Sequence, residues 1–134
     1  MQSIWGNLVT KCIFCSLDSS RIEKESDLFL IIKDLYPVGE GHSLLIPKRH
    51  VQSFFDLTEN ETASLLKMLR EQKQELSSAD ETITGYNVGI NDGKDAGQTV
   101  MHCHIHLIPR RKGDMKDPGG GVRGVIPNKQ KYYD

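Results

Sequence analysis

The sequence predicts an α+β domain: a mainly antiparallel sheet of about five strands, with one long helix and one or more short ones. Two observations carry this prediction. Several short segments are apolar or alternate between apolar and polar residues, as strands do. One segment instead has leucines at helical spacing behind a helix-start signal. The 134 residues suit a single domain over 1–134, with an N-terminal arm at 1–11 and a C-terminal tail at 116–134.

The first half of the chain contains a candidate hairpin. Leu28–Ile32 is a short apolar run typical of a buried strand. Residues 37–41 read Pro-Val-Gly-Glu-Gly and predict a turn. The returning strand would be His42–Ile46, ended by Pro47. The polar segment Ser16–Ser26 before the hairpin is expected to be a turn or a short helix.

The clearest helix signal begins at Thr58, which can cap a helix while Glu61 reaches back to it. A helix over roughly 59–78 should therefore follow and pack one apolar stripe on the sheet. The stripe consists of Leu65, Leu66, Leu69 and Leu76. After the helix, the β-rich composition of residues 82–90 predicts another strand.

Residues 101–109 contain three of the five histidines of the chain, at strict period two. In a β-strand His102, His104 and His106 would lie on one face, each roughly 7 Å from the next. A chance polar face is the alternative, but histidine is uncommon in strands and titrates near neutrality, which favours a shared chemical role. The opposite, core-facing set would be Cys103, Ile105 and Leu107.

A turn-rich connection, residues 91–98, leads into the histidine strand. It is longer than a minimal hairpin loop, and its glycines allow close backbone approach to an anion. A phosphate-binding loop and a plain surface loop both fit this composition. Residues 110–112, Arg-Arg-Lys, supply local positive charge that either steers a polyphosphate or is simply solvated.

The pair Cys12-x-x-Cys15 fits a metal half-site, a redox dithiol or two inert buried thiols. With three cysteines in the chain, a disulfide framework is not expected, and a reducing cytoplasm is the expected location. Two thiolates need further ligands to complete a tetrahedral zinc site. Because Cys103 would face the core, histidine would have to supply them.

The net charge of −1 does not suggest a nucleic-acid partner. The beginning of the sequence lacks the apolar stretch of a signal peptide. The longest apolar run, Leu28–Ile32, is far too short to span a bilayer, so no membrane association is expected.

Taken in order, Cys12-x-x-Cys15, the segment Gly41–His50 and the three alternating histidines resemble the signature of the histidine triad (HIT) superfamily of nucleotide hydrolases and transferases. The resemblance covers roughly residues 10–115 and implies a HIT-like fold. Gln98-Thr99-Val100 before the triad, and the Pro-Arg-x-x-Gly-Asp pattern after it, look most like dinucleoside polyphosphate hydrolases of the fragile-histidine-triad type. Transferases acting on hexose phosphates carry Gln in place of His106.

The resemblance implies hydrolysis at the α-phosphate through a covalent nucleotidyl-histidine, with release of a nucleoside monophosphate. His104 would be the nucleophile, His106 would stabilise the phosphoryl oxygens, and His42 would fix imidazole orientation. A purine nucleoside phosphoramidase is the enzymatic alternative, and a zinc-stabilised nucleotide sensor without turnover is the non-enzymatic one. The implied nucleotide contacts are Asp34 to the ribose, and Asn91, Gln98, Thr99 and His106 to the phosphates.

The resemblance also implies one structural zinc per chain, and a polyphosphate substrate can bring Mg²⁺ with it. A homodimer whose sheet continues across the two-fold axis is expected. The tail at 116–134 would close over either a nucleotide or a neighbouring subunit. The implied zinc ligands are Cys12, Cys15, His50 and His102.

Overall fold

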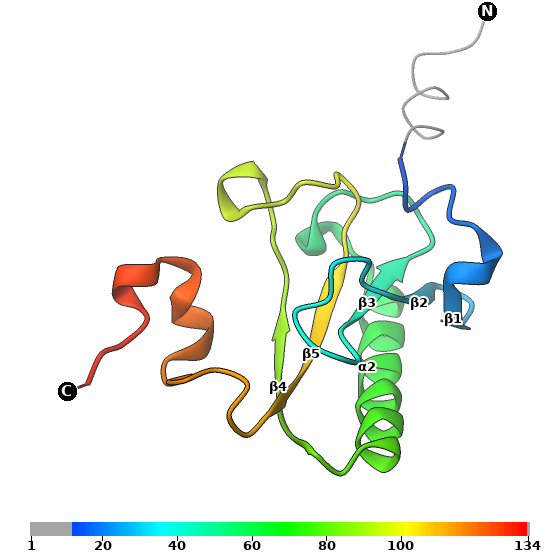
Figure 1. Cartoon of the computed structure of the whole chain (residues 1–134). Helices are drawn as coiled ribbons and strands as arrows, with labels where there is room; N and C mark the ends of the chain where they lie inside the picture. Colours follow the sequence, from blue (N-terminus) through cyan, green and yellow to red (C-terminus); the bar gives the residue numbers. More distant parts are fainter. Residues whose placement is uncertain (1–11, 134) are drawn as a thin grey trace, which may run out of the picture.

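The computed structural model describes residues 12–133, so the expected arm at 1–11 lies outside the described residues. A five-stranded sheet and one long helix make up the fold (Figure 1), which confirms the predicted fold class. The spatial order of the strands is β1-β2-β3-β5-β4, and each neighbouring pair is antiparallel. The main elements are β1 (Ile22–Glu25), β2 (Phe29–Lys33), β3 (Ser43–Pro47), α2 (Glu59–Ala79), β4 (Ile83–Gly89) and β5 (Ile105–Arg111).

Short 3₁₀ turns complete the described chain. Two of them, η4 and η5, lie in the tail; η4 contacts β4, and η5 packs on η4 (Figure 1). None of the described helices is long and apolar enough to cross a membrane. The turns are η1 (Ser19–Arg21), η2 (Phe54–Asp56), η3 (Lys94–Ala96), η4 (Gly121–Val125) and η5 (Pro127–Lys129).

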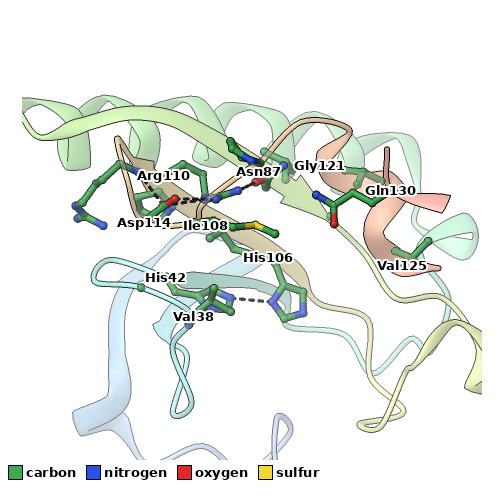
Figure 2. A pocket seen from close by; sticks show the side chains of 18 of the residues that line it. Val38, His42, Asn87, His106, Ile108, Arg110, Asp114, Gly121, Val125 and Gln130 are labelled. Atoms are coloured by element: carbon green, nitrogen blue, oxygen red, sulfur yellow. Dashed lines mark hydrogen bonds and ion pairs between the residues drawn. The ribbon is translucent and has the colours of Figure 1, made fainter. Parts of the chain in front are cut away.

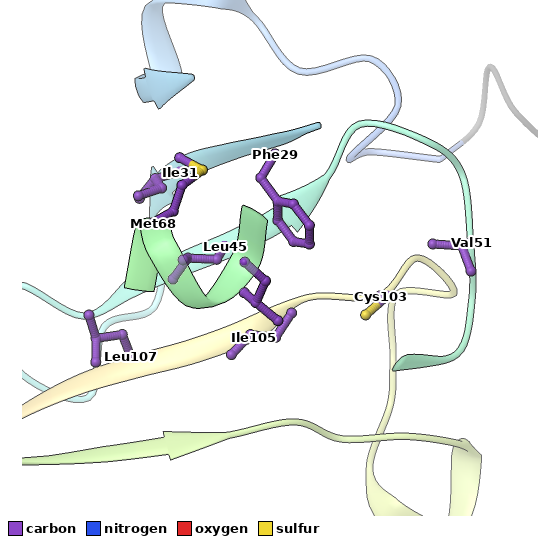
Figure 3. Packing of buried hydrophobic residues seen from close by; sticks show 9 residues of the cluster. Phe29, Ile31, Leu45, Val51, Met68, Cys103, Ile105 and Leu107 are labelled. Atoms are coloured by element: carbon purple, nitrogen blue, oxygen red, sulfur yellow. The ribbon is translucent and has the colours of Figure 1, made fainter. Parts of the chain in front are cut away.

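The sheet has an apolar cluster on each face. One cluster packs under α2 and takes Leu65 and Met68 from the helix (Figure 3). The cluster on the other face contains Phe14, Leu30 and Ile32. Because both faces are covered, β2 and β3 are apolar almost throughout rather than alternating.

Helix α2 begins as the sequence predicts. Thr58 Oγ1 accepts from the N–H of Glu61, and Glu61 Oε1 accepts from the N–H of Thr58. The predicted stripe is wrong at Leu66, which is 46% exposed, whereas Met68 and Gln72 are buried. Leu66 lies one residue, about 100° of rotation, from the buried Leu65.

Three strand assignments differ from the prediction. Residues 22–25, expected as turn or short helix, form β1, because edge pairing to β2 overrides their polar composition. Strand β3 includes Pro47, which pairs with Phe29 at the end of the ladder. Strand β5 begins only at Ile105, so His102 and His104 precede the strand.

Candidate active site and metal centre

The triad histidines share one side of the chain even though the regular strand starts at Ile105. His102 and His104 are buried, and the His104 and His106 ring centroids are 5.4 Å apart. The intervening side chains, Cys103, Ile105 and Leu107, belong to the cluster under α2. Alternation therefore persists through the extended segment before β5, as the sequence pattern predicts.

His42, which directly precedes β3, meets His106 of β5 (Figure 2), with His42 Nε2 2.9 Å from His106 Nδ1. His42 Nδ1 accepts a hydrogen bond from the N–H of Val38 at 3.0 Å. The proton of a neutral His42 is therefore on Nε2 and is donated to His106 Nδ1. The proton of a neutral His106 must then be on its own Nε2. The pair thus presents one N–H donor beside the ring of His104.

Asp34 completes this group from the end of β2. Its Oδ2 lies 3.4 Å from His42 Nε2 and 3.9 Å from His106 Nδ1, while Oδ1 accepts from the N–H of Tyr36. Burial lowers the pKa of both histidines below 6.5, and the Asp34 charge opposes that shift only in part. These lowered pKa values favour the neutral form of both rings, in agreement with the tautomer assignment.

His104 is held with one nitrogen available. Its Nδ1 lies 2.8 Å from the carbonyl oxygen of His102, so Nδ1–H donates and Nε2 keeps a free lone pair. The edge of Phe14 packs against this ring at a centroid distance of 5.0 Å and an interplanar angle of 74°. An imidazole whose Nδ1 is occupied and whose ring is fixed in this way can present Nε2 for nucleophilic attack.

The four residues implied as zinc ligands come together although they lie far apart in the chain. Their ligand atoms all lie within 4.8 Å of one another. Both cysteine Sγ atoms are 3.5 Å from His102 Nδ1, and Cys15 Sγ is 3.1 Å from His50 Nδ1. The ligands are Cys12, Cys15, His50 and His102.

The donor chemistry of this cluster fits a metal ion. His102 Nε2 lies 2.7 Å from the carbonyl oxygen of Pro47 and donates to it, which leaves the Nδ1 lone pair facing the sulfurs. Burial and the neighbouring Cys12 raise the pKa of Cys15 to about 11. A bound cation would be needed to hold Cys15 as a thiolate at neutral pH.

The segment that carries His50 is anchored to the start of α2. Arg49 donates through Nε and Nη2 to the two carboxylate oxygens of Glu61, at 3.2 and 2.8 Å. These hydrogen bonds lower the pKa of Glu61 below 4.5. The capping carboxylate of the helix thereby also fixes the approach of a metal ligand.

The residues predicted to contact phosphate lie in different surroundings from one another. Gln98 is buried: its Oε1 accepts from the N–H of Gly93, and its Nε2 donates to the carbonyls of Gln52 and Val100. In this conformation Gln98 holds the loop, and its amide groups are used by the backbone. Thr99 is exposed, and Asn91 lines a cavity next to the histidine pair.

This cavity has a volume of about 710 Å³ and lies between the sheet and the tail (Figure 2). His42 and His106 form one end, β4 and β5 the floor, and the tail the opposite wall. Sequence reasoning missed the cavity and the role of Phe14. The signal for Phe14 was its place between the two candidate metal-ligand cysteines. For the tail, the sequence predicted only that it would close over a nucleotide or a neighbouring subunit.

Comparison with known proteins identifies several relatives of this chain. The nitrilase and fragile histidine triad fusion protein of Caenorhabditis elegans is 44% identical over 87 residues, which are 65% of this chain and 20% of that protein. The asymmetrical bis(5′-nucleosyl)-tetraphosphatase of Schizosaccharomyces pombe is 38% identical over 98 residues, 73% of this chain and 53% of that enzyme. The chain thus spans about a fifth and about half of these two relatives.

A solved structure also resembles this fold. A Zn-bound histidine triad family protein from Mycobacterium smegmatis superposes with a TM-score of 0.71 at 34% identity, over 81% of each chain. The sequence model of the HIT domain matches residues 18–113, well over half of the chain. The chain with these alternating histidines therefore belongs to the HIT domain family.

Proposed function

We propose that this protein is a nucleotide hydrolase that cleaves dinucleoside polyphosphates, or related nucleotides, at the α-phosphate. The observation that carries the proposal is the pairing of two nitrogens with opposite roles. His104 Nε2 has a free lone pair, because Nδ1–H donates to the carbonyl oxygen of His102. His106 Nε2 carries a proton, because its Nδ1 accepts from His42.

The proposed reaction has two displacements. In the first, His104 Nε2 forms a bond to the α-phosphorus while the bond from phosphorus to the leaving-group oxygen breaks. His106 donates a hydrogen bond to a phosphoryl oxygen and offsets the developing charge. In the second, water attacks the same phosphorus, the phosphorus–nitrogen bond breaks and the nucleoside monophosphate leaves. The water proton is released to solvent or to the free imidazole.

The nucleotide contacts form part of the proposal. Asp34 has a carboxylate beside the histidine pair, suited to accept hydrogen bonds from ribose hydroxyls. Asn91 and Thr99 are proposed to contact the phosphates. Gln98 is proposed to act by holding the loop, because its amide already bonds three backbone groups.

The names of the relatives support this substrate class. A tetraphosphatase acting on bis(5′-nucleosyl) compounds is among them, and the C. elegans relative contains a fragile histidine triad region. Phosphoramidate cleavage is the second candidate, because the same nucleophile can displace an amine from phosphorus. A nucleotide sensor without turnover remains the non-enzymatic alternative. Homodimer formation is also proposed, supported by the position of β4 at the edge of the sheet.

A nucleotide screen tests the proposal. Wild-type protein should release AMP from diadenosine tetraphosphate, or from an AMP–amine conjugate for the second candidate, with and without Mg²⁺. Mass spectrometry of the quenched reaction should detect an AMP adduct on His104. Replacement His104→Ala should remove both turnover and adduct while AMP binding remains measurable. Near-normal turnover by His104→Ala would contradict the mechanism, and binding without product in the wild type would favour the sensor.

We also propose that the Cys₂His₂ cluster holds one structural zinc ion, as its ligand set favours. When bound, the ion would keep the knuckle around Cys12 and Cys15 folded and fix the His102 ring. Elemental analysis should find about one zinc per chain, lost in Cys12→Ser. The matched control is Cys103→Ala, because Cys103 is buried on the helix side of the sheet. Zinc-free wild-type protein after purification with added zinc would contradict this assignment.

A further inference from the structure

We propose that the cavity between the sheet and the tail is the leaving-group site, and that it takes a heteroaromatic ring: the base of the second nucleoside of the substrate. This inference rests on the proposed hydrolase function. It assigns the tail residues of η4, together with Gln130, a direct role in substrate selection.

The position of the cavity carries the first step. His42 and His106 line one end of it, whereas His104 and the metal ligands do not line it. In phosphoryl transfer the leaving group departs roughly in line with the attacking atom and away from it. With His104 as the attacking group, a leaving group that departs past His106 therefore enters this cavity.

The size and walls of the cavity carry the second step. A volume of about 710 Å³ lies within the usual range for small-molecule sites. Val88 lines it from β4, and Val122 and Val125 line it from the tail. These side chains are 44%, 65% and 77% exposed, so a flat ring placed between them would remove apolar surface from water.

The charges around the cavity argue for a ring rather than a phosphate chain. Arg110 donates to both carboxylate oxygens of Asp114 and to Asn87 Oδ1. Arg111 donates to Asp80 Oδ2 at 2.9 Å. Both arginines that line the cavity are thus neutralised by carboxylates, and a polyphosphate would have to compete with these pairs.

Two side-chain amides that line the cavity can form hydrogen bonds with the edge of a nucleotide base. Asn87 uses its Oδ1 for Arg110, and Gln130 uses its Nε2 for the carbonyl of Gly119 at 3.1 Å. Among the hydrogen bonds of the described residues, Asn87 Nδ2 and Gln130 Oε1 have no partner. One donor and one acceptor can therefore meet the acceptor and donor groups on the edge of a base.

The test compares a substrate that has a second base with one that has none. Diadenosine tetraphosphate places a nucleotide in the leaving group, whereas adenosine 5′-phosphoramidate releases only ammonia. Variant Val125→Asp changes the cavity wall, and Ile126→Asp is the matched control, because the neighbouring Ile126 is 59% exposed and does not line the cavity. Val122→Asp is a second wall variant.

Both wall variants should lower kcat/KM for diadenosine tetraphosphate about tenfold, the effect of losing one buried apolar side chain. They should leave cleavage of the phosphoramidate and binding of AMP, measured by calorimetry, within about twofold. Ile126→Asp should change none of these. Unchanged dinucleotide cleavage, or an equal loss of AMP binding, would overturn the leaving-group site. Wild-type protein that releases AMP only from the phosphoramidate would overturn this site but not the hydrolase; no AMP from either substrate would overturn the hydrolase itself.

Discussion

Replacing Phe14 by leucine tests whether the candidate metal-binding knuckle, the segment around Cys12 and Cys15, positions the proposed nucleophile His104. Phe14 lies between Cys12 and Cys15 and is 8% exposed. Its ring is edge-on to His104 at 5.0 Å and to His102, a proposed zinc ligand, at 6.0 Å. Each such pair contributes about 0.5–1.5 kcal/mol, so Phe14→Leu should lower the free energy of unfolding by about 1–3 kcal/mol while retaining most apolar contacts.

The effect of Phe14→Leu on catalysis depends on which contacts that orient the His104 ring are lost. The Nδ1–H bond to the His102 carbonyl remains, whereas the edge contact from Phe14 is lost. A 1 Å misplacement of a reacting group can cost about a hundredfold, so loss of one of two constraints should lower kcat about tenfold. KM should stay within about twofold, because the ground-state nucleotide contacts are intact.

Steady-state AMP release and metal content should be measured on the same preparations. Ile13→Ala is the matched control, because Ile13 is in the same knuckle but is 54% exposed. We expect full metal content in both variants and a reduced kcat only in Phe14→Leu. A metal-loaded Phe14→Leu variant with wild-type kcat would refute the positioning argument, and loss of metal in this variant would assign Phe14 to knuckle folding instead.

Two further predictions concern pH. The charge of Asp34 raises the pKa of His42 and His106, whereas burial lowers it. Asp34→Asn should therefore shift the acidic limb of the pH profile of kcat/KM to lower pH. A shift of this limb to higher pH would contradict the assigned electrostatics. Hydrogen bonds from Arg49 lower the pKa of Glu61 below 4.5, so its stabilisation is present above about pH 4.5 and is lost at lower pH. Glu61→Gln should therefore lower the free energy of unfolding by about 1–2 kcal/mol at pH 7 and by less at pH 4. The effect is modest because Arg49 is half-exposed and solvent screens the ion pair. Denaturant titrations at both pH values check this.

The segments that the sequence predicted well have patterns that repeat locally. The capping box depends on Thr58 and Glu61, three residues apart, and forms as expected. The alternation at His102, His104 and His106 survives even where regular strand pairing is absent, because an extended backbone suffices to separate the two faces. The membership of the metal cluster came from resemblance rather than from spacing.

The assignments that failed depended on partners distant in the chain. β1 is too polar to be recognised as a strand by itself, and it is defined by its pairing with β2. Leu66 and Met68 both suit a helix, and the sheet beneath α2 determines which of them is buried.

The sequence by itself determined which groups can do chemistry and that the three triad histidines share a face, because side-chain direction follows from local backbone periodicity. The tertiary structure decided which nitrogens of His42 and His106 carry the proton. That depends on Val38 meeting His42 and on His42 meeting His106, 64 positions along the chain. It also decided that the tail forms a wall of the cavity beside His106, because the strand pairing and packing that bring these segments together join residues far apart in sequence.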